Sequence, residues 1–116
     1  MSLLDKEPVR RVKEVLKAFD NSLNIVVLDK SARTAKDAAS SLKCEIGAIV
    51  KSLLFTTENS FILALIAGDK KCSLKKLKKI MNKKDVSMAN PEEVKTQTGY
   101  TIGGVSPVGH LKPIMI

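Results

Sequence analysis

The stretch that decides the fold is Ala48-Ile49-Val50-Lys51-Ser52-Leu53-Leu54-Phe55, the pattern of a buried β-strand that carries one lysine. Side chains alternate between the two faces of a strand, so Lys51 shares a face with Leu53 and Phe55. Both faces are mostly apolar, so we expect Lys51 in a desolvated environment, where an ammonium group needs a partner. Lys51 is therefore a candidate for anion binding or catalysis. An edge-strand lysine that reaches out to water is the alternative.

This stretch is predicted to pair with a second strand in a hairpin. Alternating and β-branched residues predict strands over Ile49–Thr56 and Phe61–Ala67, and the polar residues Thr57-Glu58-Asn59-Ser60 predict a hairpin turn between them. Two further short strands are expected, over Asn24–Leu28 and over Leu111–Ile116. The last of these reaches the final residue, so a domain that ends on a strand and a chain truncated at its C-terminus both remain open.

Four helices are predicted between the strands. The first spans Pro8–Phe19, and the others begin after the capping residues Thr34, Ser73 and Asn90, the last one ending at Gly99. In the third helix we expect a core-facing stripe of Leu74, Leu77, Ile80 and Met81. Helices and strands do not alternate regularly, so the chain is predicted to be a single α+β or mixed α/β domain over residues 1–116.

Positive charge is concentrated in one segment. The chain has 20 Lys and Arg residues against 12 Asp and Glu residues, a net charge of +8. Eight lysines lie between Lys70 and Lys84, a stretch without an acid, so the remaining twelve basic residues balance the acids. A concentrated basic patch attracts polyanions. Nucleic-acid phosphates are the expected partner; a membrane surface is the rival, but the apolar stripe of this helix is needed for the core.

Composition excludes several classes of protein. No apolar run reaches the roughly 20 residues that span a bilayer, and charged residues interrupt any signal-peptide pattern. Cys44 and Cys72 are the only cysteines, which favours a reduced, cytoplasmic setting, and with one histidine they are too few for a structural zinc site. Three phenylalanines and one tyrosine are too few for the stacking platforms of base-reading domains.

A glycine-rich loop, Gly103-Gly104-Val105-Ser106-Pro107 with Gly109 after it, is the second candidate site. Glycines let backbone N–H groups approach a ligand closely, and such groups hold oxyanions, carboxylates or phosphates; a tight turn without a ligand is the more frequent alternative. Ser106 and His110 could form a nucleophile and base, but no acid close in sequence completes a triad. Gly68 and Asp69 follow a predicted strand, where ligand-contacting residues often lie, although Asp69 could equally cap a turn.

Five segments in this order resemble one family, the YbaK/prolyl-tRNA-synthetase-associated editing domains. They are Thr34–Ala39, Ile49–Phe55, Leu63–Asp69, Ser87–Val94 and Thr98–His110. Each motif is modest alone, but five in order over nearly the whole chain from Asn24 are specific. Members of this family are aminoacyl-tRNA deacylases that act in cis or in trans, and they usually continue beyond the point where this chain stops.

The resemblance implies a mixed, partly barrel-like β-sheet surrounded by helices. It implies hydrolysis of the ester of a mischarged tRNA, commonly tRNA for proline carrying a small wrong amino acid. Catalytic roles then fall on Lys51 and Gly104. Substrate contacts fall on Leu28, Thr34, Gly68, Asp69, Gly103, Val105, Ser106, Pro107, Gly109 and His110, and contacts to the tRNA backbone on Lys71, Lys75, Lys78 and Lys79. We expect tRNA and a prolyl-tRNA synthetase as partners, and neither a cofactor nor a metal.

Three functions remain open on these grounds. The first is a freestanding deacylase that edits mischarged tRNA in trans. The second is a non-catalytic tRNA-binding module that keeps the fold and the basic helix, and the third is a basic structural protein without a role on tRNA. Substitution of Lys51 separates the first two, and neutralisation of the lysine-rich helix tests the third.

Overall fold

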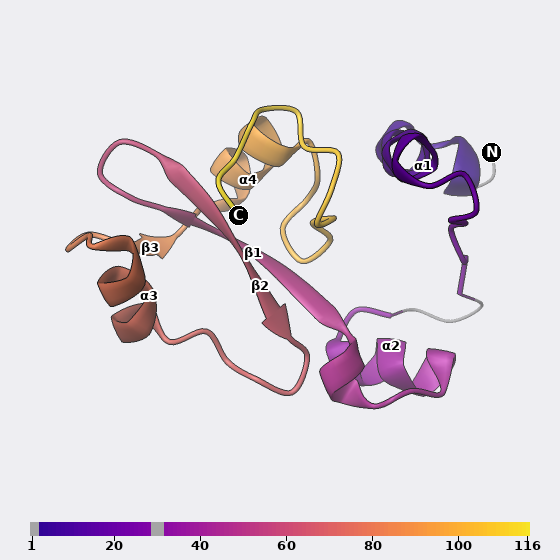
Figure 1. Cartoon of the computed structure of the whole chain (residues 1–116), viewed down its shortest axis with the longest axis horizontal. Coiled ribbons are helices and arrows are strands. Elements are labelled where there is room, and N and C mark those ends of the chain that lie inside the picture. The colour runs from indigo at the N-terminus through magenta and orange to yellow at the C-terminus, as the bar shows by residue number, and fades with distance from the viewer. Residues whose placement is uncertain (1–2, 29–31) are drawn as a thin grey trace.

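A computed structural model describes residues 3–28 and 32–116 of the chain (Figure 1). Short 3-10 turns at Leu3–Asp5 and Ile46–Ala48 accompany four helices and three strands. The helices are α1 (Glu7–Phe19), α2 (Ala35–Leu42), α3 (Leu74–Met81) and α4 (Pro91–Thr98), and the strands are β1 (Val50–Thr56), β2 (Phe61–Ala67) and β3 (Ser87–Met88). The chain is thus α+β, as the order of predicted elements indicated.

The centre of the fold is the predicted hairpin. β1 pairs with β2 in antiparallel register from Val50 opposite Ala67 to Thr56 opposite Phe61. The turn is closed by the Thr57 N–H, which donates to the Ser60 carbonyl at 2.8 Å. β3, a strand too short to predict, pairs antiparallel with the end of β1, and the sheet order is β2-β1-β3.

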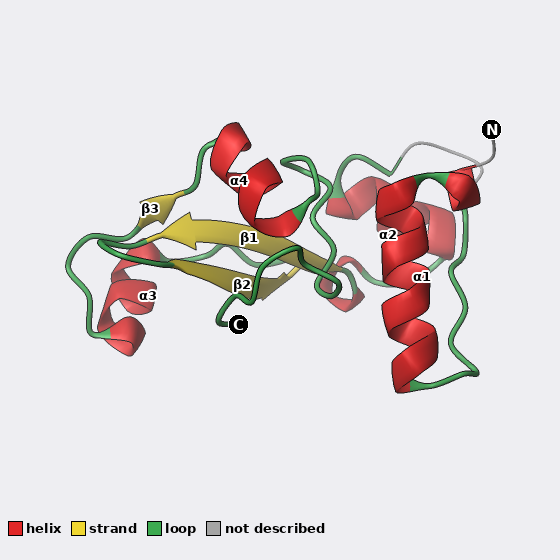
Figure 2. Cartoon of the chain, turned by 90° about the horizontal axis from the view of Figure 1, so that it is seen from above, coloured by secondary structure: helices red, strands yellow, loops and turns green. Residues whose placement is uncertain are grey.

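The two faces of the hairpin bury different residues. Leu54 and Leu63 pack with Ala89 and Val94 beneath α4. On the opposite face Phe55, Ile62 and Val86 form a second buried cluster, against which Leu77 and Met81 of α3 pack. Figure 2 shows α3 and α4 on opposite sides of the strands. Lys51 belongs by alternation to the face of Phe55, whereas Ser52 belongs to the face of Leu54.

The helix signals in the sequence are confirmed at atomic level. The Thr34 hydroxyl accepts from the Asp37 N–H at 3.0 Å, and the Ser73 hydroxyl accepts from the backbone N–H of Lys76 at 3.2 Å. Asn90 and Glu93 form a reciprocal capping box at the start of α4. Gly99 ends α4 in the left-handed conformation, with φ of 81°.

Two expectations about strands are wrong. Asn24–Leu28 forms no strand over its described length, because the outer edge of β2 is met by a different segment and Val26 and Val27 remain exposed. That segment is the end of the chain, but Leu111–Ile116 contributes one parallel bridge, Ile62 to Met115, rather than a strand; Pro113 lacks the N–H that a longer ladder needs. In the part of the chain that the structure describes, the sheet is three-stranded and does not close into a barrel.

The apolar stripe of α3 is narrower than predicted. Leu77 and Met81, four residues apart on one face, contact the core. Leu74 is 40% exposed and Ile80 is 79% exposed, because an eight-residue helix that lies on a small sheet buries only its innermost face.

Candidate functional site

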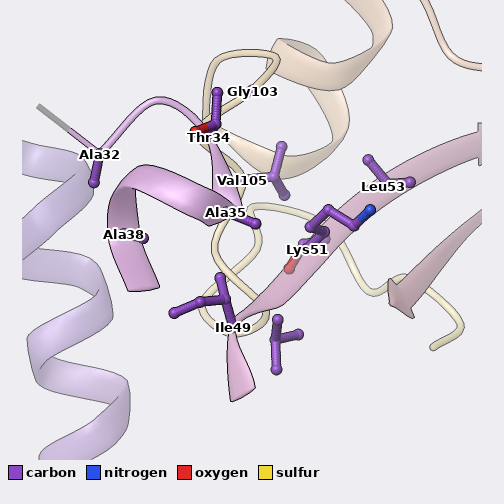
Figure 3. A pocket seen from close by; sticks show the side chains of 11 residues that line it. Ala32, Thr34, Ala35, Ala38, Ile49, Lys51, Leu53, Gly103 and Val105 are labelled. Atoms are coloured by element: carbon purple, nitrogen blue, oxygen red, sulfur yellow. The ribbon is translucent and has the colours of Figure 1, made fainter. Parts of the chain in front are cut away.

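A cavity of about 230 Å³ lies between α2, the first half of β1 and the glycine-rich loop (Figure 3). Thr34 at the cap of α2, Lys51 on β1, and Gly103 and Val105 on the loop all line it. These four were proposed from sequence segments that are far apart in the chain, and the fold brings them together. The remaining lining is mostly aliphatic: Ala32, Ala35, Ala38, Ile49, Val50, Ser52 and Leu53.

Small residues allow α2 to approach the sheet at this cavity. Ala35 and Ala38 face it, and Gly68 lies behind them. A Cβ atom at Gly68 would overlap the Ile46 carbonyl oxygen and lie 3.0 Å from the Ala35 Cβ. Gly68 also donates its N–H to the Ile49 carbonyl at 2.7 Å. Gly68 therefore shapes the cavity from behind, rather than from a position on its lining.

Lys51 lies at the rim of the cavity. Its side chain is half-buried, so the expectation of a fully desolvated lysine is wrong, and the alternative of a lysine that reaches outward is closer to the structure. The Nζ atom donates to the Lys70 carbonyl oxygen at 2.5 Å. In Figure 3 the nitrogen points away from Ala35. β1 has no second neighbour at this point because β3 pairs only with Phe55 and Thr56, which leaves room for the side chain to turn outward.

The glycine-rich loop presents its tip to the same cavity. Gly103 has φ of 83°, a conformation that favours glycine, and a Cβ atom there would meet no atom within 4 Å. The Gly104 N–H is already used, because it donates to the Thr101 carbonyl at 2.9 Å and closes a turn. Among the described hydrogen bonds the Gly103 N–H has no acceptor, and Gly103 itself lines the cavity, so of this pair it is the donor that is free.

Arg11 of α1 joins the end of α4 to the end of this loop, which the sequence did not reveal. Its Nε donates to the Gly109 carbonyl at 2.7 Å, and one guanidinium nitrogen donates to the Thr98 carbonyl at 3.4 Å. The guanidinium carbon lies 4.7 Å from the centre of the Tyr100 ring. The Tyr100 hydroxyl in turn donates to the carbonyls of Val108 and Gly109, both at 2.9 Å. Helical periodicity in α1 draws attention to its valines, and nothing in that pattern marks an arginine that acts on residue 109.

Ser106 and His110 do not form a nucleophile–base pair. The Ser106 hydroxyl accepts from the Val108 N–H at 3.1 Å, whereas a His110 ring nitrogen lies 2.7 Å from the Ser106 carbonyl oxygen. Ser106 lines a separate cavity of about 330 Å³ between the loop and α1. Pro107 is exposed, and Gly109, with φ of 73°, faces α1.

Two proposed substrate residues lie away from the cavity. Leu28 lines a cavity of about 530 Å³ with Val26, Val27 and the end of α2. Asp69 is exposed, and its carboxylate lies beside Gly47, where a Cβ atom would be 3.1 Å from the nearer oxygen. Neither residue is on the lining of the main cavity, although Asp69 directly precedes Lys70, whose carbonyl accepts from Lys51.

Of the four proposed tRNA-contacting lysines, Lys75, Lys78 and Lys79 lie on α3, at the opposite end of the hairpin from α2 (Figure 1), whereas Lys71 lies in the segment between β2 and α3, next to Lys70. Lys71, Lys75 and Lys79 are exposed, while Lys78 is half-buried beside a cavity of about 250 Å³ at the hairpin turn. Lys70, whose carbonyl holds Lys51, begins the lysine-rich segment. The rim of the cavity and the basic helix are thus connected through residues 70 and 71.

Ser52 was not among the predicted site residues. It lines the main cavity and also a small recess of about 20 Å³ behind it, which Leu54, Ala89, Val94 and Val105 share. Among the described side chains, its Oγ is the one buried polar atom without a hydrogen-bond partner. A serine inside a strand gives no sequence signal of this kind, because partner atoms are set by the fold.

Two searches of the described residues are negative. No group of three or more His, Cys, Asp or Glu side chains is placed to hold a metal ion. No helix in the same residues has the length and apolar character that crossing a membrane requires.

Comparison with known proteins places the chain in a family. The model of the aminoacyl-tRNA editing domain matches residues 29–116. The proline–tRNA ligase of Thermosipho africanus is 36% identical over 83 residues, 72% of this chain and 15% of the ligase, and that of Kosmotoga olearia is 34% identical over 109 residues, 94% of this chain and 17% of the ligase. The chain thus spans less than a fifth of these ligases.

A solved structure agrees over most of the fold. The crystal structure of a proposed trans-editing enzyme for prolyl tRNA synthetase superposes with a TM-score of 0.87 at 40% identity, covering 94% of this chain and 69% of that one. The family match, the ligase segments and this structure agree with the resemblance carried by the five sequence motifs. The chain therefore belongs to the aminoacyl-tRNA editing domain family.

Proposed function

We propose that this chain is an aminoacyl-tRNA deacylase that acts in trans and hydrolyses the ester of a mischarged tRNA. The observation that carries the proposal is the cavity where α2, β1 and the glycine-rich loop meet, since it gathers Thr34, Lys51, Gly103 and Val105. In an editing domain this is the concave site with convergent polar groups that a small ligand requires. The fold family supports a role in editing; the reaction and its substrate are our inference.

Lys51 supplies positive charge at the rim of the cavity. Its ammonium group already satisfies a carbonyl oxygen, that of Lys70, so a substrate oxygen can take the same place without new desolvation. The terminal phosphate of the tRNA or the ester carbonyl fits this role, because each offers an oxygen acceptor.

The glycine-rich loop faces Lys51 from the other side of the cavity. Its unpaired Gly103 N–H is suited to stabilise the oxygen that becomes negative when water adds to the ester carbonyl, while the Gly104 turn holds that amide in place. Water, or a group of the substrate itself, attacks the carbonyl carbon. The ester C–O bond then breaks to leave a free amino acid and the tRNA 3′-terminal hydroxyl.

The recess behind the cavity supports a small amino acid as the substrate. Its volume of about 20 Å³ is a small fraction of the 230 Å³ of the main cavity. A methyl-sized side chain fits, and each further methylene is rejected by about 1–3 kcal/mol. Tests begin with tRNA for proline, because the related ligase segments belong to proline–tRNA ligases.

The lysine-rich helix α3 is proposed to hold the tRNA backbone. Three of the four lysines named above are exposed, and each phosphate that a lysine neutralises contributes affinity that depends on salt but not on sequence. A prolyl-tRNA synthetase is a proposed partner, and the cytoplasm, where charged tRNA is used, is the proposed location.

One observation favours a second candidate, a non-catalytic tRNA-binding module. The Lys51 ammonium and the Gly104 N–H are both occupied by backbone carbonyls of the chain itself. If these bonds persist with tRNA bound, the cavity offers few donors for catalysis while α3 still binds RNA.

Deacylation of a panel of mischarged tRNAs separates the two. The chain is incubated with tRNA for proline that carries alanine, serine, cysteine or proline, with an exposed-lysine control, Lys36→Ala, and with Lys51→Ala. We expect release of a small amino acid by the wild type and the control but not by Lys51→Ala. Binding without release from any member of the panel supports the binding module instead.

A further inference from the structure

We propose that the Ser52 hydroxyl binds the α-ammonium group of the substrate's aminoacyl moiety, an inference that rests on the proposed function. The starting observation is that Ser52 Oγ is buried and has no hydrogen-bond partner among the described residues. Nearly all buried polar side-chain atoms are paired, so an unpaired one requires an explanation. Because Ser52 lines the cavity, its unpaired hydroxyl is explained if a group of the bound ligand forms the missing hydrogen bond.

The position of Ser52 selects which part of the substrate it meets. Ser52, Leu53, Gly103 and Val105 line both the 230 Å³ cavity and the 20 Å³ recess, so they mark the junction between the two. If a small side chain occupies the recess, the α-carbon lies at this junction. The α-carbon carries the ammonium group and the ester carbonyl, and both then come next to Ser52.

The other polar groups of the cavity favour the ammonium group over the carbonyl. Lys51 and the Gly103 N–H are donors, which suit the carbonyl or a phosphate oxygen. The ammonium group needs an acceptor, because a buried charge without a partner is costly. Thr34 Oγ1 already accepts from the Asp37 N–H at the exposed cap of α2, whereas Ser52 Oγ is buried and has no partner among the described residues, so Ser52 is the side-chain acceptor that gains most from the ammonium group.

A ligand role and a structural role predict opposite effects on stability. A hydroxyl that stabilises the free protein lowers the melting temperature when it is removed. A buried hydroxyl without a partner destabilises the free protein, so Ser52→Ala should keep or raise the melting temperature while it weakens function. Ser52→Thr and Ser52→Val form a matched pair, since they have the same shape and differ in one hydroxyl.

The test compares an alanyl ester of tRNA for proline with the corresponding propionyl ester, which lacks only the amino group. For Ser52→Ala we expect kcat/KM to fall about tenfold on the alanyl ester and less than about twofold on the propionyl ester. The kcat/KM of Ser52→Thr should exceed that of Ser52→Val on the alanyl ester, and the two variants should not differ on the propionyl ester. Equal losses on both esters, no loss on either, or a lowered melting temperature for Ser52→Ala would overturn the proposal.

A binding measurement keeps the inference separate from the reaction. If the wild type hydrolyses no ester, the deacylase proposal fails, and the probes become the 3′-amide analogues of alanyl- and propionyl-adenosine, which cannot be hydrolysed. About tenfold weaker binding of the alanyl analogue by Ser52→Ala, with unchanged binding of the propionyl analogue, would uphold the role of Ser52. Equal binding of the alanyl analogue by both proteins would overturn it.

Discussion

The two ends of the hairpin are built for different tasks. At the α2 end, small and aliphatic side chains enclose a cavity in which single polar groups have defined places. At the α3 end, lysines are exposed on a helix that buries little more than Leu77 and Met81. Charge attracts a polyanion without fixing its position, whereas a cavity selects by shape. Substitutions at the α2 end should therefore change turnover, and those at the α3 end should change affinity and its salt dependence.

The largest effect is expected from Lys51→Ala. Loss of the one cationic side chain among the described lining residues should reduce single-turnover deacylation by about a hundredfold or more, as removal of an electrostatic group at a reacting oxygen commonly does. Affinity for tRNA should change by less than about threefold, because α3 is unaltered. A Lys51→Ala chain that retains its rate while losing affinity would assign the lysine to binding and break the division between the two ends.

The next largest effect is expected on stability, when either of two glycines with a left-handed backbone conformation is replaced. Both Gly99 and Gly103 have positive φ, but only at Gly99 would a Cβ atom meet the Arg11 guanidinium and the Leu111 side chain. We expect Gly99→Ala to lower the free energy of unfolding by about 2 kcal/mol or more, and Gly103→Ala by about 1 kcal/mol, the strain of the backbone alone. Chemical denaturation measures both. Equal destabilisation would show that the contact between α1 and the loop contributes little.

Arg11 and Glu7 form a matched pair on α1. The Arg11 side chain is 17% exposed and donates to the carbonyls of Thr98, the last residue of α4, and Gly109 of the loop, whereas the Glu7 side chain is 61% exposed and forms an ion pair with Arg11. Arg11→Ala should reduce stability by about 1.5 kcal/mol and speed amide exchange across residues 99–110, while Glu7→Ala should cost about 0.5 kcal/mol or less. Unchanged exchange in the Arg11 variant would mean that the loop holds its conformation without α1.

The smallest effect is expected at α3. Replacing the exposed residues Lys71, Lys75 and Lys79 by glutamine should weaken tRNA binding about tenfold at moderate salt and flatten the salt dependence by about two to three units in the logarithmic slope. The control removes three exposed lysines elsewhere, Lys13, Lys36 and Lys112. If the two triple variants lose affinity equally, net charge rather than the α3 patch holds the RNA.

Sequence reasoning identified the elements whose signals are local. The hairpin, the capped helices and the left-handed end of α4 follow from alternation and from the chemistry of Thr34, Asn90 and Gly99, and the structure confirms them. The strands expected near each end of the chain failed, because a strand requires a partner edge and no local pattern reports whether that edge is free.

The candidate site likewise has residues that the sequence identified and contacts that only the fold shows. The family motifs led to Thr34, Lys51, Gly103 and Val105, which line one cavity. Motifs do not state where a side chain's polar atom finds its partner, so the bond from Lys51 to the Lys70 carbonyl and the unpaired hydroxyl of Ser52 emerge only from the fold. The loop anchor at Arg11 depends on a contact across 98 positions of sequence, beyond the reach of any periodic pattern.

One measurement tests the division between the two ends most directly. Single-turnover deacylation of the mischarged tRNA that the wild type hydrolyses fastest is followed at rising enzyme concentration for the wild type, Lys51→Ala and the triple glutamine variant of Lys71, Lys75 and Lys79. We predict that the triple variant reaches the wild-type maximal rate at about tenfold higher enzyme concentration, whereas Lys51→Ala binds half-maximally at the wild-type concentration and stays about a hundredfold slower at saturation. A triple variant that saturates at a low rate, or a Lys51→Ala chain that reaches the wild-type rate, would contradict the account.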